Sequence, residues 1–263
     1  MAPDSPSRIL FRTWSYSSAG TNSRRGFRSG DRNCRVIDDF ELAEHFENHS
    51  NLNNRTPTCL ISTTDDPVRA LRYAINLQAQ GEDDNDVHIS IIRSNRYVRG
   101  ENFATLFDPE NERLFKTEFL FFWEIKPTEI LHVVSLDTLV GNGLLNRFKV
   151  LDPEYWVGGT LPLLWTVRNE ICRNNEEAWS RGDRSTWPER SGRYVAAIAK
   201  CFGNGAPHRA IASLTWHHGT HFKPNNYENW GLDLRVRDAI QEVLDRNGNS
   251  RWYDQWCGEL ASV

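Results

Sequence analysis

KTEFLFFWEIKPTEILHVV, residues 116–134, is the stretch that indicates the fold most strongly. Glu118 opens a run of aromatic and aliphatic residues that extends to Ile125, and Pro127 separates this run from a second one, Glu129–Leu136. Runs rich in Phe, Ile, Val and Trp, bounded by proline and polar residues, are typical of β-strands. The stretch therefore predicts two strands joined by a turn, with a carboxylate at the start of the first strand.

Outward from this stretch, the sequence divides into two halves. In the N-terminal half we expect strands at Arg8–Trp14, Cys59–Ser62 and Val87–Ile92. Helices are expected at Asp38–His49 and from Pro67 onward. In the C-terminal half the spacing of apolar residues predicts helices at Leu161–Ile171, Tyr194–Phe202, Ala206–Trp216 and Leu232–Leu244. Loops are expected at 174–192 and 217–231. We therefore predict an α+β domain over residues 1–145 and a mainly helical region over residues 146–263.

The composition is that of an ordinary globular protein. Hydrophobic residues make up 39% and charged residues 25% of the 263 residues, and the net charge of −4 gives no global reason to bind nucleic acid or an anionic membrane. No run approaches the roughly 20 apolar residues of a membrane helix, and no secretory h-region follows Met1. We therefore expect a cytoplasmic or nuclear protein.

The cysteines are odd in number, far apart and without a CxxC pair. This pattern indicates neither a disulfide framework nor a zinc ribbon, so reduced thiols and no metal are expected. The five residues are Cys34, Cys59, Cys172, Cys201 and Cys257.

The first 35 residues are rich in arginine, whereas the chain as a whole is weakly acidic. Such a segment is either a solvated basic face or a cradle for an anionic ligand such as a dinucleotide, because the guanidinium fork suits phosphate. The arginines are Arg8, Arg12, Arg24, Arg25, Arg28, Arg32 and Arg35.

Three polar positions at expected strands form the candidate site. Arg12 lies inside the apolar run Arg8–Trp14, where a buried charge needs a partner. The triplet Ser62-Thr63-Thr64 ends a strand and precedes a helix, as a helix cap would. Glu118 opens the aromatic strand. Taken singly, each position is compatible with a structural role: an ion pair, a helix cap or a strand-edge carboxylate.

Taken in order, these positions resemble the Arg–Ser–Glu class of ADP-ribosyltransferases, which includes the cholera-type and pierisin-type toxins, and a group of fungal proteins of unassigned function. That family has an arginine on the first strand, a Ser-Thr-Ser or Ser-Thr-Thr triplet, and a catalytic glutamate whose strand runs into an Ile-Pro turn. Gly26-Phe27 matches a Gly-Phe that often follows the first loop. The resemblance covers roughly residues 8–136. It implies an ADP-ribosyltransferase-like split β-sandwich with flanking helices.

The resemblance also implies roles for the matching residues, with NAD as substrate. Cleavage of the nicotinamide–ribose bond passes through an oxocarbenium-like ribose, which a carboxylate stabilises. Arg12 would clamp the pyrophosphate or ribose, Ser62 would orient Glu118, and Glu118 would bind the ribose hydroxyl and face the developing cation. Thr63 and Thr64 would shape the strand end. The remaining residues expected near NAD are Thr13, Phe27 and Tyr73.

Two departures leave the acceptor open. Members of the family that modify arginine or nucleobases usually carry Glu or Gln two residues before the catalytic glutamate, whereas this chain has Lys116. Glu110 and Glu112 form a true Glu-x-Glu pair, but they lie in a polar segment without the following Ile-Pro strand. The acceptor could be a protein side chain, a nucleobase or water, so the expected activity is mono-ADP-ribosyl transfer or NAD hydrolysis.

Other interpretations remain. His217, His218 and His221 could bind a metal, although no carboxylate motif accompanies them. Gly203-Asn-Gly205 indicates a turn rather than a phosphate loop. The chain could be a catalytically inactive relative whose helical half binds a protein partner, or a toxin or effector delivered into another cell.

Overall fold

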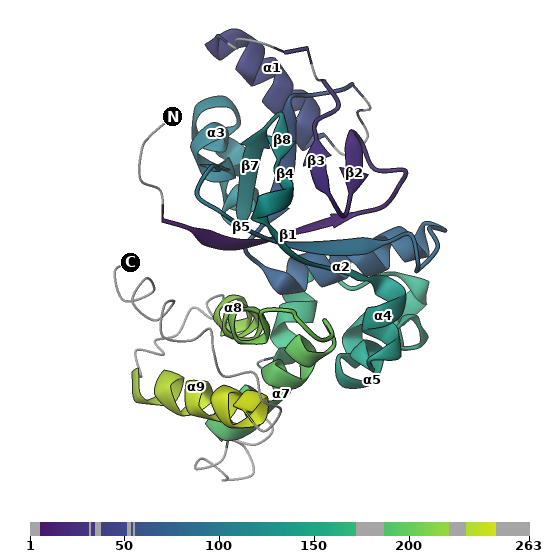
Figure 1. Ribbon diagram of the computed structural model, residues 1–263, viewed down its shortest axis with the longest axis vertical. Coiled ribbons are helices and arrows are strands. Elements are labelled where there is room, and N and C mark those ends of the chain that lie inside the picture. The colour runs from purple at the N-terminus through teal and green to yellow at the C-terminus, as the bar shows by residue number, and fades with distance from the viewer. Residues whose placement is uncertain are drawn as a thin grey trace. The chain divides into compact units, whose positions relative to one another are not determined.

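The computed structural model describes residues 6–31, 33–34, 38–51, 54, 56–171, 187–220 and 230–245 (Figure 1). The chain forms two compact units. The first comprises Met1–Asp66 and Leu77–Leu136, and the second comprises Pro67–Asn76 and Asp137–Val263. The sequence pattern predicted a single boundary after residue 145. In the structure the second unit begins earlier, at Asp137, and also contains the helical segment Pro67–Asn76.

The first unit contains two sheets, so the expected mixture of helices and strands is confirmed, and the strands of both sheets are antiparallel. The larger sheet has six strands in the order β6-β7-β4-β1-β5-β9. These strands are β1 (Arg8–Trp14), β4 (Leu60–Thr64), β5 (His88–Ser94), β6 (Val98–Arg99), β7 (Glu118–Phe122) and β9 (Ile130–Ser135). The smaller sheet has the order β2-β3-β8, with β2 (Thr21–Ser23), β3 (Gly26–Arg28) and β8 (Glu124–Ile125).

The larger sheet has a weak seam between β1 and β4. Only Phe11 and Thr64 are paired across it. By contrast, β1 and β5 share seven residue pairs and β4 and β7 share five. The ladder between β1 and β4 is therefore only one residue pair long. Arg12 and Ser62 lie beside the seam, so the architecture brings two of the three candidate site residues close together.

The expected strand from Glu118 to Ile125 is broken at Trp123. This residue has φ 62°, in the left-handed region that side chains other than glycine rarely adopt. Two backbone hydrogen bonds hold it there: Trp123 N donates to Cys59 O (2.8 Å), and Ser29 N donates to Trp123 O (2.8 Å). The chain therefore leaves the larger sheet after β7 and enters the smaller sheet as β8.

Each face of the larger sheet carries its own apolar cluster. Side chains alternate along a strand, so neighbouring residues point to opposite faces. One cluster joins the larger sheet to residues of the smaller one and includes Leu10, Trp14, Phe27, Ile61, Phe119, Phe121 and Ile125. The other lies against α1 (Asp39–Ser50) and α3 (Gly100–Phe107) and includes Phe46, Cys59, Leu60, Phe103, Phe115 and Leu120.

Helix α1 begins at Asp39, one residue after the predicted start, and Asp38 is its N-cap. The Asp38 side chain accepts a hydrogen bond from Glu41 N (2.8 Å), which satisfies one of the unpaired amides of the first turn. Two 3-10 helices, η1 (Pro109–Phe115) and η2 (Pro127–Glu129), precede β7 and β9.

Helices make up the second unit. They are α2 (Pro67–Ala79, of which Pro67–Asn76 belongs to this unit), α4 (Leu136–Gly141), α5 (Leu144–Arg147), residues 164–171, α7 (Trp187–Lys200), α8 (His208–Thr220) and α9 (Trp230–Asp245). Short 3-10 turns are η3 (Lys149–Leu151), η4 (Pro153–Tyr155) and η5 (Val157–Gly159). The four predicted C-terminal helices are present. The prediction of loops at 174–192 and 217–231 is wrong where it can be checked, because residues 187–192, 217–220 and 230–231 are helical. The other residues of both segments lie outside the described ones.

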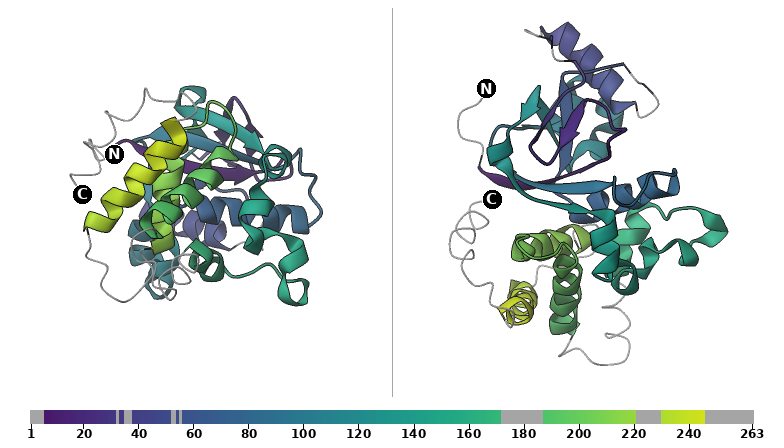
Figure 2. Two further views of the ribbon diagram at one scale, coloured as in Figure 1. Left: turned by 90° about the horizontal axis from the view of Figure 1, so that it is seen from below. Right: turned by 45° about the vertical axis from the view of Figure 1, so that its right-hand side comes forward.

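Gly192 allows two helices of this unit, α7 and α9, to pack closely (Figure 2). A Cβ atom at Gly192 would lie 2.5 Å from Val236 O and 2.7 Å from Ala239 Cβ, both on α9. We expect Gly192→Ala to lower the free energy of unfolding by about 1–3 kcal/mol, because the helices must separate. Gly141→Ala is the matched control, since nothing lies within 4 Å of a Cβ there. Equal stabilities of the two variants in urea unfolding would contradict this packing.

Candidate active site

Arg12, Ser62 and Glu118 come together in the first unit. Ser62 Oγ donates a hydrogen bond to Glu118 Oε1, and Arg12 Nη1 donates to the backbone oxygen of Ser62 (2.8 Å). Strand pairing explains the first contact: Ser62 lies opposite Leu120, so Glu118 is its diagonal neighbour on the same face of the sheet. Residues 50 and 56 positions apart in sequence thus share one hydrogen-bonded group.

The Arg12 guanidinium is fixed from two further sides. Its Nη2 donates to Asn22 Oδ1 (2.9 Å), and its Cζ lies 5.2 Å from the centre of the Phe27 ring. The Asn22 amide is itself oriented, because its Nδ2 donates to Ser18 O (3.0 Å) and Ala19 O (3.1 Å). These contacts hold the planar guanidinium in one orientation.

Glu118 is enclosed, with only 8% of its surface exposed. Gly100, the first residue of α3, lies directly against it: a Cβ atom there would be 3.1 Å from both the Glu118 Cβ and the Glu118 backbone oxygen. The glycine therefore lets α3 approach the start of β7. A carboxylate in such surroundings acts on a nearby positive charge more strongly than one in water.

A fourth residue, His49, joins the site and was not predicted from the sequence. It lies in the last turn of α1, where its Nε2 is 2.6 Å from Ser62 Oγ and its Nδ1 is 3.2 Å from Thr58 Oγ1. The sequence pattern did predict the helix that ends here. The contact with Ser62 is tertiary, however, and no local motif indicated it.

The hydrogen bonds around His49 allow one consistent assignment of donors and acceptors. Because Glu118 Oε1 accepts from the Ser62 hydroxyl, Ser62 Oγ can accept from Nε2–H of His49. Nδ1 of His49 then accepts from the Thr58 hydroxyl. This assignment, made from the network, uses the neutral imidazole. Burial lowers the pKa of His49, and the positive charge of Arg12 lowers it as well, while Glu118 opposes the shift. We therefore assign His49 as neutral at pH 7.

The lowered pKa of His49 predicts a loss of stability in acid. Below the unfolded-state pKa of 6.5, the unfolded chain binds a proton at this residue more readily than the folded chain does. The free energy of unfolding should therefore fall as the pH decreases from about 7.5 to about 5.5. His49→Gln, which cannot titrate, should show a smaller fall in denaturant unfolding at the two pH values. The remaining fall would include a contribution from His88, because burial lowers the pKa of this residue as well. Identical pH dependence in parent and variant would contradict the assignment.

The two threonines of the triplet contact backbone atoms. Thr63 Oγ1 donates to Phe119 O (2.8 Å) and so ties β4 to β7. Thr64 Oγ1 accepts from Asp66 N (3.1 Å) at the turn that leads into α2. Both side chains are buried. They hold the strand end that carries Ser62.

The other residues expected near NAD lie in different surroundings. Phe27 is buried in the apolar cluster beneath Arg12. Thr13 follows Arg12 on β1, so the two side chains point to opposite faces of the sheet. Tyr73 lies on α2 in the second unit and is 40% exposed. Of these three residues, Phe27 contacts the site, through the Arg12 guanidinium that lies over its ring.

The alternative site residues lie elsewhere. Glu110 and Glu112 are in η1 rather than in a strand, and Lys116 is the exposed cap of that helix. His217 and His218 are on α8, and His221 lies outside the described residues. Gly203 and Gly205 have φ values of 82° and 86° in the turn after α7, as expected for a turn.

Among the described residues, one group has metal-ligating side chains close together: Cys34, His45 and Cys59. The described cysteines, which also include Cys201, are free thiols. Cys172 and Cys257 lie outside the described residues. Within the described part of the chain, no helix is long and apolar enough to cross a membrane.

Comparison with known proteins gives one family. Residues 5–139 match the model described as Domain of unknown function (DUF7587), which covers just over half of the chain. No curated protein and no solved structure matches. The matched region contains Arg12, His49, Ser62 and Glu118.

Proposed function

We propose that this chain, which belongs to the family described as Domain of unknown function (DUF7587), is an NAD-dependent mono-ADP-ribosyltransferase or NAD glycohydrolase. The observation that carries the proposal is the contact between the Ser62 hydroxyl and the Glu118 carboxylate, with Arg12 bonded to the backbone oxygen of the same serine. These residue types occur in this order in the Arg–Ser–Glu class that the sequence resembles. Their convergence makes one site out of three separate motifs.

The site has the chemical groups that cleavage of the nicotinamide–ribose bond requires. As nicotinamide leaves, positive charge develops on the ribose, and a fixed carboxylate lowers the energy of that state. Ser62 holds one oxygen of the Glu118 carboxylate. In the proposed mechanism Glu118 also bonds a ribose hydroxyl and thereby places the sugar. Arg12, restrained by Asn22 and Phe27, binds the pyrophosphate.

The strand arrangement also supports the proposal. A split β-sandwich of the ADP-ribosyltransferase type needs two sheets that separate near the catalytic strands. The larger sheet has its weakest pairing between β1 and β4, and the chain changes sheets at Trp123. We infer that the first unit is an ADP-ribosyltransferase-like domain on these grounds.

Lys116 bears on which group accepts the ADP-ribose. This exposed residue occupies the position two before Glu118, where relatives that modify arginine or nucleobases carry Glu or Gln. The guanidinium group of a substrate arginine offers only hydrogen-bond donors. The ammonium group of a lysine also has donors only, so Lys116 cannot bind such a substrate by a hydrogen bond. We therefore propose water or a side chain other than arginine as the acceptor.

The second candidate is an inactive relative that binds a protein partner. It is favoured by large apolar side chains exposed in the second unit: Tyr155, Val157, Leu163, Trp165 and Leu234. Four of them, Tyr155, Val157, Leu163 and Trp165, lie within eleven residues of one another in sequence, and a contiguous exposed apolar surface would mark an interaction site. In this case the second unit would carry the function.

Titration with NAD separates the two candidates. A ligand that binds only the folded state raises the free energy of unfolding, by about 2.7 kcal/mol at a hundred times the dissociation constant, and the unfolding midpoint rises with it. We expect this rise with NAD and none with nicotinamide-free controls such as adenosine. An unchanged midpoint at millimolar NAD would favour the inactive candidate.

A further inference from the structure

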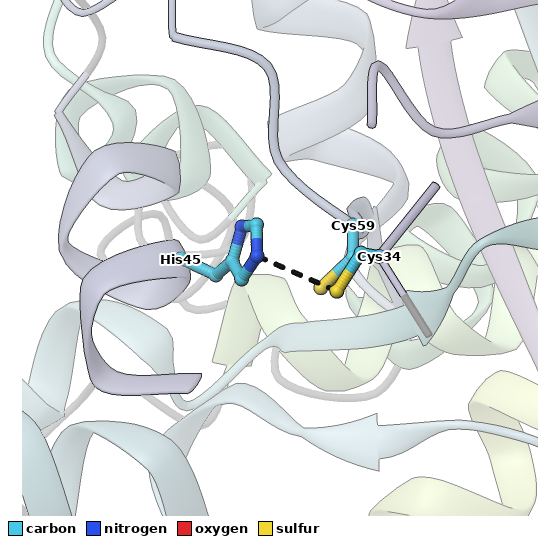
Figure 3. Close-up of side chains that lie close together, drawn as sticks. All are labelled: Cys34, His45 and Cys59. Atoms are coloured by element: carbon cyan, nitrogen blue, oxygen red, sulfur yellow. Dashed lines mark hydrogen bonds between the residues drawn. The ribbon is translucent and has the colours of Figure 1, made fainter. Parts of the chain in front are cut away.

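A second group of side chains in the first unit brings two thiols and an imidazole together. Cys34 lies in the loop after β3, His45 lies on α1, and Cys59 immediately precedes β4. Their ligand atoms all lie within 4.8 Å of one another, and Cys34 Sγ is 3.5 Å from His45 Nε2. Figure 3 shows the His45 ring pointing toward the two sulfur atoms, which lie next to each other. Three separate segments thus converge on one point.

The donor set suits a particular kind of metal ion. Thiolate and imidazole are the preferred ligands of Zn²⁺, which binds them at about 2.3 Å and 2.0–2.1 Å in tetrahedral geometry. Neighbouring ligand atoms in such a tetrahedron are about 3.5–3.8 Å apart. The 3.5 Å separation between Cys34 Sγ and His45 Nε2 already has this value, and the other separations need only a small contraction.

Solvent reaches one side of the group, because Cys34 and His45 are only half-buried. Cys59 is fully buried and belongs to the apolar cluster that contains Phe46 and Leu60. Asp31 Oδ1 accepts hydrogen bonds from Cys34 N (3.1 Å) and Asn33 N (2.9 Å), which fixes the loop that presents the Cys34 thiol. The ligands are thus positioned by packing and by backbone contacts.

A nucleophilic role for these thiols fits less well. Burial raises the pKa of the Cys59 thiol to about 12 in the metal-free protein, and the neighbouring Cys34 adds to the shift. The thiolate is the reactive form of cysteine, and without a metal it is scarce at neutral pH when the pKa is this high. A bound Zn²⁺ ion, by contrast, deprotonates the thiols that coordinate it.

We propose that Cys34, His45 and Cys59 bind a Zn²⁺ ion, with water in the fourth position. The ion would tie the loop after β3 and helix α1 to the start of β4. His45 and His49 are four residues apart on α1 and so lie on one face of the helix. The same ion would therefore hold α1 where His49 contacts Ser62. The metal site stands whether or not the chain acts on NAD.

Metal analysis of the full-length chain tests the site. We expect about one zinc ion per chain after purification from zinc-supplemented cells, without a histidine tag. Cys34→Ser and Cys59→Ser should each lose the ion. Cys201→Ser is the matched control, because this free, buried thiol lies in the second unit. A parent protein without zinc, or full retention in both variants, would overturn the proposal.

Cobalt substitution keeps the test independent of how the variants fold. The parent protein, stripped of metal and titrated with Co²⁺, should develop the visible bands of tetrahedral cobalt and a near-ultraviolet thiolate-to-cobalt band. Absence of these bands would overturn the site. A disulfide between Cys34 and Cys59, detected as two missing thiols by titration and a linked peptide by mass spectrometry, would overturn it as well.

Discussion

Glu118→Gln is expected to lower the rate of NAD cleavage by about 10²–10³-fold, the loss seen when a single group that stabilises transition-state charge is removed. Glutamine has nearly the same shape, and its carbonyl oxygen can still accept from the Ser62 hydroxyl. It lacks the negative charge, however, so the developing ribose cation loses its nearest counter-charge. Steady-state measurement of nicotinamide release should show the loss in kcat and a much smaller change in KM.

Glu124→Gln is the matched control for this substitution. Glu124 lies six residues further along, on β8 and opposite Arg28, and is half-exposed. It should keep full activity. Unfolding curves of both variants should resemble that of the parent, since neither substitution changes side-chain volume appreciably. Equal turnover by the parent and Glu118→Gln would remove Glu118 from the mechanism.

Arg12→Gln is expected to weaken NAD binding by roughly 10- to 100-fold, because a hydrogen bond to a charged group contributes roughly 1.5–3 kcal/mol. The substitution also removes the donor to Ser62 O, and with it a side-chain contact between β1 and β4. Arg12→Lys should lie between parent and Gln, since it keeps the charge but loses the planar fork. Calorimetric titration of NAD measures each affinity directly.

The control for Arg12 is Arg25→Gln. Arg25 is exposed in the turn between β2 and β3, so its loss removes one charge from the same basic segment. If Arg25→Gln weakened binding as much as Arg12→Gln, the arginine-rich segment would act through its overall charge. The specific clamp at Arg12 would then be contradicted.

Much of the first unit could be predicted because its elements are locally encoded. Arg8–Trp14 and Val87–Ile92 carry alternating or continuous apolar residues, and β1 and β5 form there. Asp38 supplies a cap, and α1 begins after it. The predicted residues Arg12, Ser62 and Glu118 meet because each lies on a strand and these strands are neighbours in the sheet.

What could not be predicted depends on contacts between distant residues. The positive φ of Trp123 is imposed by backbone bonds to Cys59 and Ser29, and no local propensity indicates it. His49 becomes part of the site only because α1 packs near the end of β4. Cys34 and Cys59 are 25 positions apart without a CxxC pair, so their spacing gave no indication of a metal site.

The most direct test of the central claim is product analysis of NAD incubated with the full-length chain. Chromatography and mass spectrometry should show free nicotinamide, together with ADP-ribose in solution or attached to protein. The amount should grow with time for the parent and stay near background for Glu118→Gln. Intact NAD after prolonged incubation of folded parent protein, with candidate acceptors present, would contradict the account.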